Sequence, residues 1–347
     1  MRIAVWARAL IGVLAMGSCV SGGQAEATVA AGSLSLLTYN VEGLPWPVRL
    51  GRGEKLRQIG DTLAALRAQG RQPHVVVLQE AFTPEAKAIA ARAGYRYVAD
   101  GPAAAEAGVD GETSADRSFA SGASLLRGEA AGKWLDSGLR IASDYPIVAV
   151  RRMAYPAYAC AGFDCLANKG VLAVSIRVPG MADPVAIVAT HLNSRRASHA
   201  PADRALYAYQ RQVDALSAFV RRVVPSRYPF VLVGDLNVGR RVERRSYLIR
   251  NAAGWRGAQP PAVAMEQCLP DPTCNKANLP DLRYSFHRAR DWQFYSDGRA
   301  TGLRVAGITG LFGHDGQGAM LSDHVGYVAS YRLVLRRPDA PLMVASR

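Results

Sequence analysis

The sequence of 347 residues lacks internal repeats, an interdomain linker and, beyond its N-terminus, any apolar run long enough to cross a membrane. The apolar stretch near the N-terminus, Ala9–Met16, is far shorter than the ~20 residues that a membrane-spanning helix needs. Hydrophobic residues make up 49% of the chain, which is enough for a large core. These features disfavour a membrane-embedded protein or a repeat array and predict a single domain over residues 28–347.

The N-terminus has the features of a secretory leader. Arg2 and Arg8 precede the apolar stretch, and small residues follow it at Ala25 and Ala27. This order is typical of a signal peptide that is removed on export. We therefore predict a signal peptide over residues 1–27 and a secreted or periplasmic mature protein.

Cysteine is scarce, with five residues in the whole chain. One of them, Cys19, follows Met-Gly-Ser and offers a less favoured alternative, a bacterial lipid anchor, to which Met16 fits poorly. In an exported protein, pairs of cysteines close in sequence predict small disulfide loops. A zinc site is the other alternative, disfavoured because the spacings are not of the CxxC kind and no histidine is adjacent. The two pairs are Cys160 with Cys165 and Cys268 with Cys274.

Acidic residues are in deficit, with 28 Asp and Glu against 42 Lys and Arg, a net charge of +14 and a pI of about 9.9. Such basicity suits nucleic acid, an anionic membrane surface or a phosphorylated substrate. A solvated surface without a specific ligand is the alternative, so charge alone does not separate a nuclease from a lipid-hydrolysing enzyme. The arginines occur as adjacent pairs at 195–196, 221–222, 240–241 and 244–245.

Five apolar runs lead to, or follow, polar side chains suited to phosphate chemistry. The clearest is PFVLVGDLNV, residues 229–238, a short β-rich run that predicts a buried strand. Asp235 and Asn237 follow this run, and alternate residues of a strand share one face. Side chains of this kind at one sheet edge indicate metal-assisted phosphoryl transfer. The other runs are associated with Asn40, with Glu80, with His191 and Asn193, and with Asp323 and His324.

The motifs TYN, LQE, THLN, GDLN and SDH stand in the order found in the endonuclease/exonuclease/phosphatase superfamily, which the chain resembles from about Leu34 to Tyr331. This superfamily includes pancreatic-type deoxyribonucleases, abasic-site endonucleases, inositol polyphosphate phosphatases and neutral sphingomyelinases. The resemblance implies an α+β fold of the deoxyribonuclease-I type. In this four-layered α/β/β/α sandwich, two mixed β-sheets pack face to face between helices.

The resemblance also implies roles for the polar side chains. Glu80, helped by Asn40, would bind the metal, for which Mg²⁺ is expected, with Mn²⁺, Co²⁺ or Ca²⁺ as alternatives. His324 is the candidate general base, because imidazole titrates near neutral pH, and Asp323 would orient it or reach the metal. The other catalytic candidates are His191 and Asn237 as donors to phosphoryl oxygens, and Asp235 as an aid to the leaving group or the water.

One further catalytic aspartate is expected on a strand between the GDLN and SDH motifs. Asp291 fits this position by its order and by the aromatic strand after it, better than Asp281 or Asp297 does. Its context, Trp292-Gln293-Phe294, departs from the usual DyIf pattern of the family.

The stretch from Phe163 to Val171 indicates which branch of the superfamily the chain resembles. It is similar to the D-x-L-A-x-K-G-V stretch of neutral sphingomyelinases, in which the Asp and the Lys form a switch near the active site. Asp164 and Lys169 occupy these positions. The alternative is a turn with a solvated lysine.

We therefore expect an exported, Mg²⁺-dependent phosphodiesterase that cleaves sphingomyelin to ceramide and phosphocholine by attack of water on phosphorus. It would act at a membrane surface as a monomer without an obligate protein partner, and Trp46 and nearby apolar residues are suited to enter lipid. A secreted nuclease with the same site is the alternative, which strong, salt-dependent DNA binding would favour. The intact polar set disfavours a non-enzymatic binding module.

Outside the motifs, apolar spacing predicts helices over residues 54–69, 84–93 and 203–224. Residues 99–138 are predicted to be irregular, with a strand over Phe119–Leu126. The Cys268–Cys274 region, with prolines on both sides, is predicted to be a surface excursion.

Overall fold

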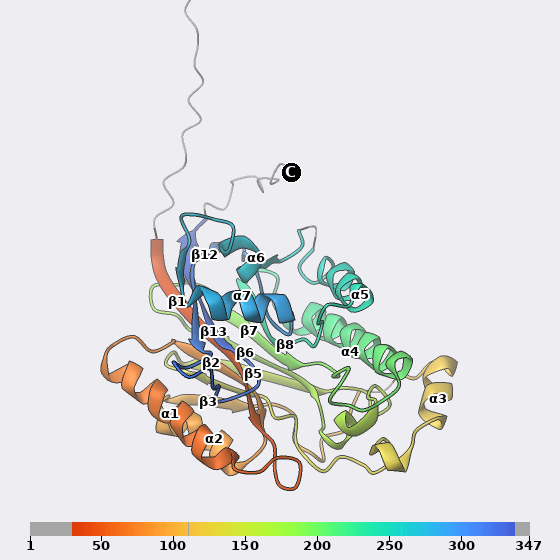
Figure 1. The fold of residues 1–347 in the computed structure, drawn as a ribbon. Helices are drawn as coiled ribbons and strands as arrows, with labels where there is room; N and C mark the ends of the chain where they lie inside the picture. The colour runs from red at the N-terminus through yellow and green to blue at the C-terminus, as the bar shows by residue number, and fades with distance from the viewer. Residues whose placement is uncertain (1–29, 110, 258, 337–347) are drawn as a thin grey trace, which may run out of the picture.

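A computed structural model describes residues 30–109, 111–257 and 259–336, and its strands form two sheets (Figure 1). The seven-stranded sheet has the order β10-β12-β13-β1-β2-β4-β3. Its strands are β1 (Ala30–Gly43), β2 (Val75–Ala81), β3 (Tyr97–Asp100), β4 (Arg140–Ser143), β10 (Asn275–Ala277), β12 (Thr301–Phe312) and β13 (Gly326–Leu335). The six-stranded sheet has the order β5-β6-β7-β8-β11-β9. Its strands are β5 (Ile147–Ala154), β6 (Gly170–Ile176), β7 (Val185–His191), β8 (Phe230–Asp235), β9 (Ala262–Val263) and β11 (Asp291–Ser296).

Helices cover the outer face of each sheet, so that four layers result. Figure 1 shows α1 and α2 on one side of the sandwich and α4 and α5 on the opposite side. Of the other helices, α6 and α7 pack against β12, and α3 packs against α4. The helices are α1 (Arg52–Ala68), α2 (Pro84–Arg92), α3 (Ser114–Ser121), α4 (Ala202–Val223), α5 (Val242–Ala252), α6 (Ala264–Cys268) and α7 (Leu279–Arg288).

Three buried apolar clusters fill the spaces between the four layers. Leu36 and its neighbours along the strand alternate in direction, because successive side chains of a strand point to opposite faces. Leu36 and Val77 pack between the two sheets, whereas Leu37 and Val76 pack under α1 and α2. The third cluster fills the layer under α4 and α5. The predicted α/β/β/α sandwich is thus confirmed, and the three predicted helices agree with α1, α2 and α4.

The predicted strand over Phe119–Leu126 is wrong, because this part of the chain starts as helix α3. The Thr113 hydroxyl accepts a hydrogen bond from the Asp116 backbone N–H, and the Asp116 carboxylate accepts one from the Thr113 N–H. This capping box satisfies the first free N–H groups of a helix. Phe119 then stacks on Tyr207 of α4, with 4.6 Å between ring centroids.

The predicted surface excursion at Cys268–Cys274 is confirmed for the loop between the two cysteines, in which Pro270, Pro272 and Thr273 are exposed. Cys268 and Cys274 are 0% and 5% exposed and belong to the cluster between the sheets. They form one disulfide, and Cys160 with Cys165 forms the other. Cys268 is buried because α6, which it ends, packs against β11 and β12 at the margin of the sandwich.

Two expectations about membranes concern different parts of the chain. The expected signal peptide, including Cys19, lies outside the described residues. Within the described ranges, no helix combines the length and the apolar character needed to cross a bilayer.

Candidate active site

The polar residues at the strand ends gather where the two sheets meet. In the first sheet, β1 and β2 are parallel neighbours, which brings Asn40 beside Glu80. In the second sheet, His191 of β7 is paired in register with Asp235 of β8, and Asp235 is paired with Asp291 of β11. The cluster of polar side chains therefore combines residues from both sheets, and neither sheet alone contains all of them.

The backbone at this edge departs from regular strand geometry. Glu80 and Asn237 have φ values of +54° and +46°, which are uncommon for residues other than glycine. Gly234, with φ +147°, lies so close to β7 that a Cβ atom would stand 1.9 Å from the Thr190 carbonyl oxygen. Backbone of this kind persists where the surrounding structure holds it, and it is frequent at functional sites.

The Asn40 amide links carboxylates of the two sheets. Its Nδ2 donates to Glu80 Oε1 at 2.9 Å and to Asp235 Oδ2 at 3.2 Å. Burial raises the pKa of Glu80 to about 7, although the Asn40 hydrogen bond and the charges of His324 and Lys169 act against it. Burial likewise raises the pKa of Asp235.

This oxygen set fits a divalent cation. Burial makes the negative charge of Glu80 unfavourable, and the positive charges around it compensate for this only in part. A cation bound beside Glu80 would supply the remaining positive charge. Carboxylate oxygens are ligands that Mg²⁺ prefers. Asn40 supports them through its Nδ2, because its Oδ1 accepts a hydrogen bond from the Glu42 N–H. A second set, Asp235, Asp291 and His324, also brings one ligand atom each within 4.8 Å of one another. Its His324 is already hydrogen-bonded to Asp291, so the Glu80 set is the better candidate.

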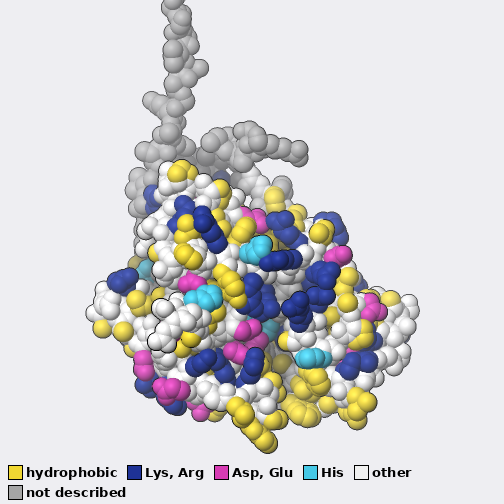
Figure 2. Space-filling model, viewed as in Figure 1, with side chains coloured by type: hydrophobic (Ala, Val, Ile, Leu, Met, Phe, Trp, Pro, Cys, Tyr) yellow, Lys and Arg dark blue, Asp and Glu magenta, His cyan; other side chains and the backbone are white. Residues whose placement is uncertain are grey.

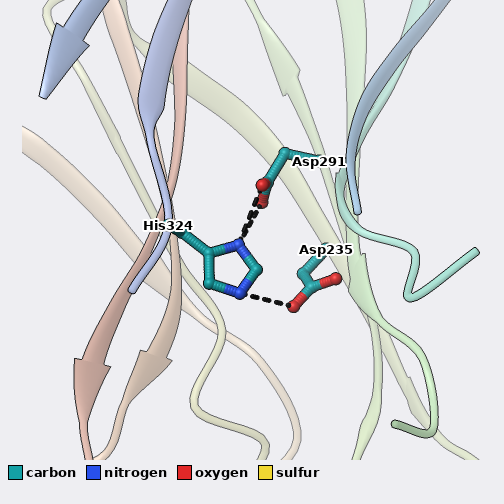
Figure 3. A group of neighbouring side chains, drawn as sticks. All are labelled: Asp235, Asp291 and His324. Carbon is teal, nitrogen blue, oxygen red and sulfur yellow. Dashed lines mark hydrogen bonds and ion pairs between the residues drawn. The ribbon is translucent and has the colours of Figure 1, made fainter. Parts of the chain in front are cut away.

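His324 lies between two buried aspartates (Figure 3). Its Nδ1 is 2.8 Å and 3.1 Å from the two oxygens of Asp291, and its Nε2 is 3.5 Å from Asp235 Oδ2. Burial disfavours the charged ring, but Asp291, Asp235 and Asp323 outweigh it and raise the pKa of His324 to about 10. In this environment the imidazole carries a proton at neutral pH.

Asp323 does not lie where it could hold the His324 ring in place. Its side chain is 50% exposed, and its carboxylate lies 3.3 Å from Arg290 Nη1 and 3.9 Å from His324 Nε2. Asp291 is therefore the residue that orients the His324 ring.

His191 lies against the Asp164–Lys169 pair. Lys169 Nζ is 2.8 Å from Asp164 Oδ2 and 3.3 Å from His191 Nε2. Burial, and then the charges of Lys169 and His324, hold the pKa of His191 well below its usual value. His191 is consequently neutral, and Lys169 is buried at the site instead of being a solvated residue of a turn.

Asn237 is fixed in place by the strand end. Its backbone N–H donates to Asp235 Oδ1 and its Nδ2 donates to the Leu192 carbonyl, each at 3.0 Å. The buried Arg244 guanidinium donates to the Asn237 and Asn193 carbonyls and so holds both loops.

These groups line a cleft of about 710 Å³. Glu80, His191, Asp235, Asn237 and His324 are on its wall, with Asp164 and Asp323. The rest of the wall is largely arginine, contributed by the loops after β7 and β8 and by the segment before β11.

Comparison with known proteins adds the family. The model of the endonuclease/exonuclease/phosphatase family matches residues 37–324. The chain belongs to this family. No curated protein matches the sequence closely enough to count as a relative.

Solved structures share the fold of this endonuclease/exonuclease/phosphatase protein at low identity. Beta toxin from Staphylococcus aureus, in a mutant form with bound magnesium ions, is 18% identical, with a TM-score of 0.59 over 86% of this chain and 99% of its own. Sphingomyelinase C from Streptomyces griseocarneus is 22% identical, with a TM-score of 0.57 over 86% and 99%. TDP2 from D. rerio with a single-strand DNA product is 14% identical, with a TM-score of 0.53 over 86% and 98%. At these identities the likeness shows the deoxyribonuclease-I-like fold.

Sequence motifs of the endonuclease/exonuclease/phosphatase family did not reveal the arginines that face the site. Arg290 Nη1 lies 3.3 Å from His324 Nε2, and Arg288 reaches Asp323. Arg290 could have been found from the sequence only because it precedes Asp291, and only once Asp291 was known to lie in the site. Arg244 was visible only as part of a basic cluster.

Proposed function

We propose that the chain is a metal-dependent phosphodiesterase that hydrolyses the head-group phosphodiester of a phospholipid. Sphingomyelin, cleaved to ceramide and phosphocholine, is the leading candidate substrate. The observation that carries the chemistry is the convergence of the Asp291–His324 pair with the Glu80–Asn40–Asp235 set in one cleft. The Asp164–Lys169 pair beside His191 supports the lipid branch.

The proposed roles follow from where each polar atom lies. A divalent cation held by Glu80, whose carboxylate Asn40 orients through Nδ2, would stabilise negative charge on the phosphoryl oxygens and oppose the proton on His324. Asp291 fixes Nδ1 of His324, so that Nε2 is the atom that exchanges a proton with the water or the leaving oxygen. Lys169, with Asp164 as its partner, adds positive charge on the other side of the phosphate.

Asp235 and Asn237 complete the proposed site. Asp235 faces both Asn40 and His324 Nε2, which suits it to hold the attacking water or assist the leaving group. Asn237 lies on the cleft wall, where its amide is suited to a phosphoryl oxygen. His191, neutral and buried, positions Lys169 and completes the wall.

Export and action at a membrane belong to the same proposal. Two disulfides support an oxidising destination. Trp46 is 76% exposed on the loop that follows β1, which suits contact with a lipid surface. We propose that the mature chain acts there as a monomer.

The test uses the mature chain with Mg²⁺ and two substrates in parallel, sphingomyelin vesicles and duplex DNA. We expect release of phosphocholine that chelator abolishes and that His324→Ala lowers by roughly 10²–10⁴-fold. His314→Ala is the matched control, because His314 also pairs with an aspartate, Asp281, but outside the cleft. DNA cleavage without lipid cleavage would replace the lipid function by the nuclease alternative.

A further inference from the structure

Two pairs of adjacent arginines reach the rim of the cleft from neighbouring loops. Arg195 and Arg196 follow His191 at the end of β7, and Arg240 and Arg241 follow Asp235 at the end of β8. Because β7 and β8 are parallel and His191 is in register with Asp235, the two loops leave the sheet at the same edge. Figure 2 shows Lys and Arg side chains gathered beside acidic groups on this face.

These four arginines have no acidic partner among the described residues. Arg221 and Arg222, which lie outside the cleft, have no ion pair among the described residues either, so what distinguishes the four rim arginines is their meeting at one cleft. The carboxylates of the cleft wall have other partners. Asp164 pairs with Lys169 and Asp323 with Arg288 and Arg290, while Asn40 donates to both Glu80 and Asp235. The rim therefore carries positive charge that the protein itself does not neutralise.

The single negative charge of the scissile phosphodiester does not account for these four arginines at the rim. A phosphodiester carries one negative charge, which His324 and a cation held by Glu80 on the cleft wall would already face. Guanidinium groups bind phosphate oxygens through paired, charge-assisted hydrogen bonds. Four more of them at the mouth of the cleft suit a second anionic group a short distance from the first.

The cleft is poorly suited to a quaternary ammonium group. Recognition of choline typically relies on the faces of aromatic side chains. None of the described residues that line the cleft is Phe, Tyr or Trp. A trimethylammonium group at this rim would meet four guanidinium groups of its own sign.

Exposed apolar side chains on loops next to site residues favour a lipid over a nucleic acid as the source of the anion. Trp46 and Leu50 are 76% and 74% exposed on the loop that follows β1 and that Arg49 ties to Glu42. Leu126 and Trp134 are 92% and 69% exposed, and Trp134 donates its backbone N–H to Leu166, two residues after Asp164. Figure 2 shows hydrophobic side chains projecting along the lower edge of this face. Single-stranded nucleic acid would instead be expected to stack on aromatic rings within the cleft.

We infer that Arg195, Arg196, Arg240 and Arg241 form a second anion subsite, which selects phospholipids whose head group carries a further phosphate beyond the scissile diester. This inference rests on the proposed phospholipid phosphodiesterase activity. It replaces sphingomyelin, the leading candidate substrate on resemblance, by a phospholipid with a phosphorylated head group.

Calorimetric binding of soluble head groups to the Mg²⁺-saturated protein tests the subsite. We expect inositol 1,4-bisphosphate to bind at least about tenfold more tightly than inositol 1-phosphate or phosphocholine. The double variants Arg240→Gln/Arg241→Gln and Arg195→Gln/Arg196→Gln should each reduce this preference. The matched control is Arg221→Gln/Arg222→Gln, at the exposed end of α4 and outside the cleft, which should keep it. Since all these side chains lie at the surface, thermal unfolding should be unchanged in each variant.

Equal binding of the three head groups, or a preference that survives both rim variants, would overturn the inference. Tighter binding of a 5′-phosphorylated tetranucleotide, lost in the same variants, would assign the rim to nucleic acid and overturn it as well. In vesicles, phosphatidylinositol 4-phosphate should be cleaved at least about tenfold faster than phosphatidylinositol, and the rim variants should reduce this ratio. Hydrolysis of bis(p-nitrophenyl) phosphate, which has no second anion, reports on the catalytic centre separately. Its loss would count against the proposed function, and the binding comparison would still decide the subsite.

Discussion

At the scale of single residues, the charge on His324 is set by carboxylates from other strands. Asp291 contacts Nδ1 with both of its oxygens, while Asp235 faces Nε2. A histidine with a pKa of about 10 retains its proton in the metal-free protein, so it cannot be a free base there. Its use as a proton acceptor requires positive charge nearby, which agrees with a cation at Glu80.

Replacement of Asp291 should therefore change both the charge and the orientation of His324. In Asp291→Asn we expect the pKa of His324 in the metal-free protein to fall, because a carboxylate that stabilises the charged ring is lost. We expect kcat for bis(p-nitrophenyl) phosphate to fall by roughly 10²–10⁴-fold, since the ring loses its orienting acceptor. NMR titration and steady-state kinetics measure the two effects. Asp281→Asn, which removes the partner of His314, should leave both unchanged.

His74 provides a second pH dependence, away from the cleft. Its Nδ1 accepts hydrogen bonds from the Ser35 N–H at 3.1 Å and the Ser35 hydroxyl at 3.0 Å. Burial lowers the pKa of His74 below 6.5, so the unfolded chain binds the proton first as pH falls. The stabilisation by neutral His74 is thus complete above pH 6.5 and is lost progressively below it.

Urea unfolding at pH 7.5 and pH 5.5 tests this linkage. The free energy of unfolding should fall more between these pH values in the wild-type chain than in His74→Gln, which has no titrating ring. An equal fall in the two proteins would show that His74 does not contribute to the pH dependence.

At the scale of elements, the contact between β7 and β8 depends on a glycine. Gly234 has φ +147°, and an added Cβ atom would meet the Thr190 carbonyl oxygen of the neighbouring strand at 1.9 Å. The side chains that follow directly, His191 and Asp235, both belong to the site. Separation of the two strands would therefore move the catalytic residues as well as weaken the sheet.

Gly234→Ala should lower the free energy of unfolding by roughly 2–4 kcal/mol and also lower kcat. Gly70→Ala is the matched control, because Gly70 also has a positive φ, +66°, but nothing lies within 4 Å of its Cβ position. The control should cost about 1 kcal/mol and leave kcat unchanged. Equal losses of stability in the two variants, measured by urea unfolding, would exclude the steric explanation.

At the scale of the whole molecule, the cleft lies at the junction of the two sheets, and its charge affects the stability of the fold. The pKa of Glu80 is raised to about 7, chiefly by burial. The folded chain thus retains a proton there that the unfolded chain releases near pH 4.5. In the metal-free protein, stability from this group is present below pH 4.5 and is lost as pH rises towards 7.

A divalent cation should restore this loss of stability. We expect Mg²⁺ to raise the melting temperature more at pH 8 than at pH 5.5, because protons compete with the cation for Glu80. Glu80→Gln should be more stable than the wild-type chain in chelator at pH 8 and should respond little to Mg²⁺. Calorimetry provides the measurement, and an undiminished Mg²⁺ response in this variant would place the cation elsewhere.

The sequence by itself determined the layers of the fold and most of the residues that meet in the cleft. Runs such as Phe230–Val233 specify buried strands through local β propensity and hydrophobicity, and the polar residues next to them have no place in the core. Asn40, Glu80, His191, Asp235 and His324 could be found in this way. The strand predicted over Phe119–Leu126 failed because a capping signal at Thr113, several residues upstream, starts a helix.

Only the tertiary structure decided how these residues pair. Asp291, and not the adjacent Asp323, orients His324, because the register of β8 with β11 places Asp291 opposite Asp235 at the junction of the sheets. The burial of Lys169 against His191 and the meeting of two arginine pairs at one rim depend in the same way on strand register. Local sequence encodes the strands, but contacts between residues far apart in the chain arise from the order and register in which those strands assemble.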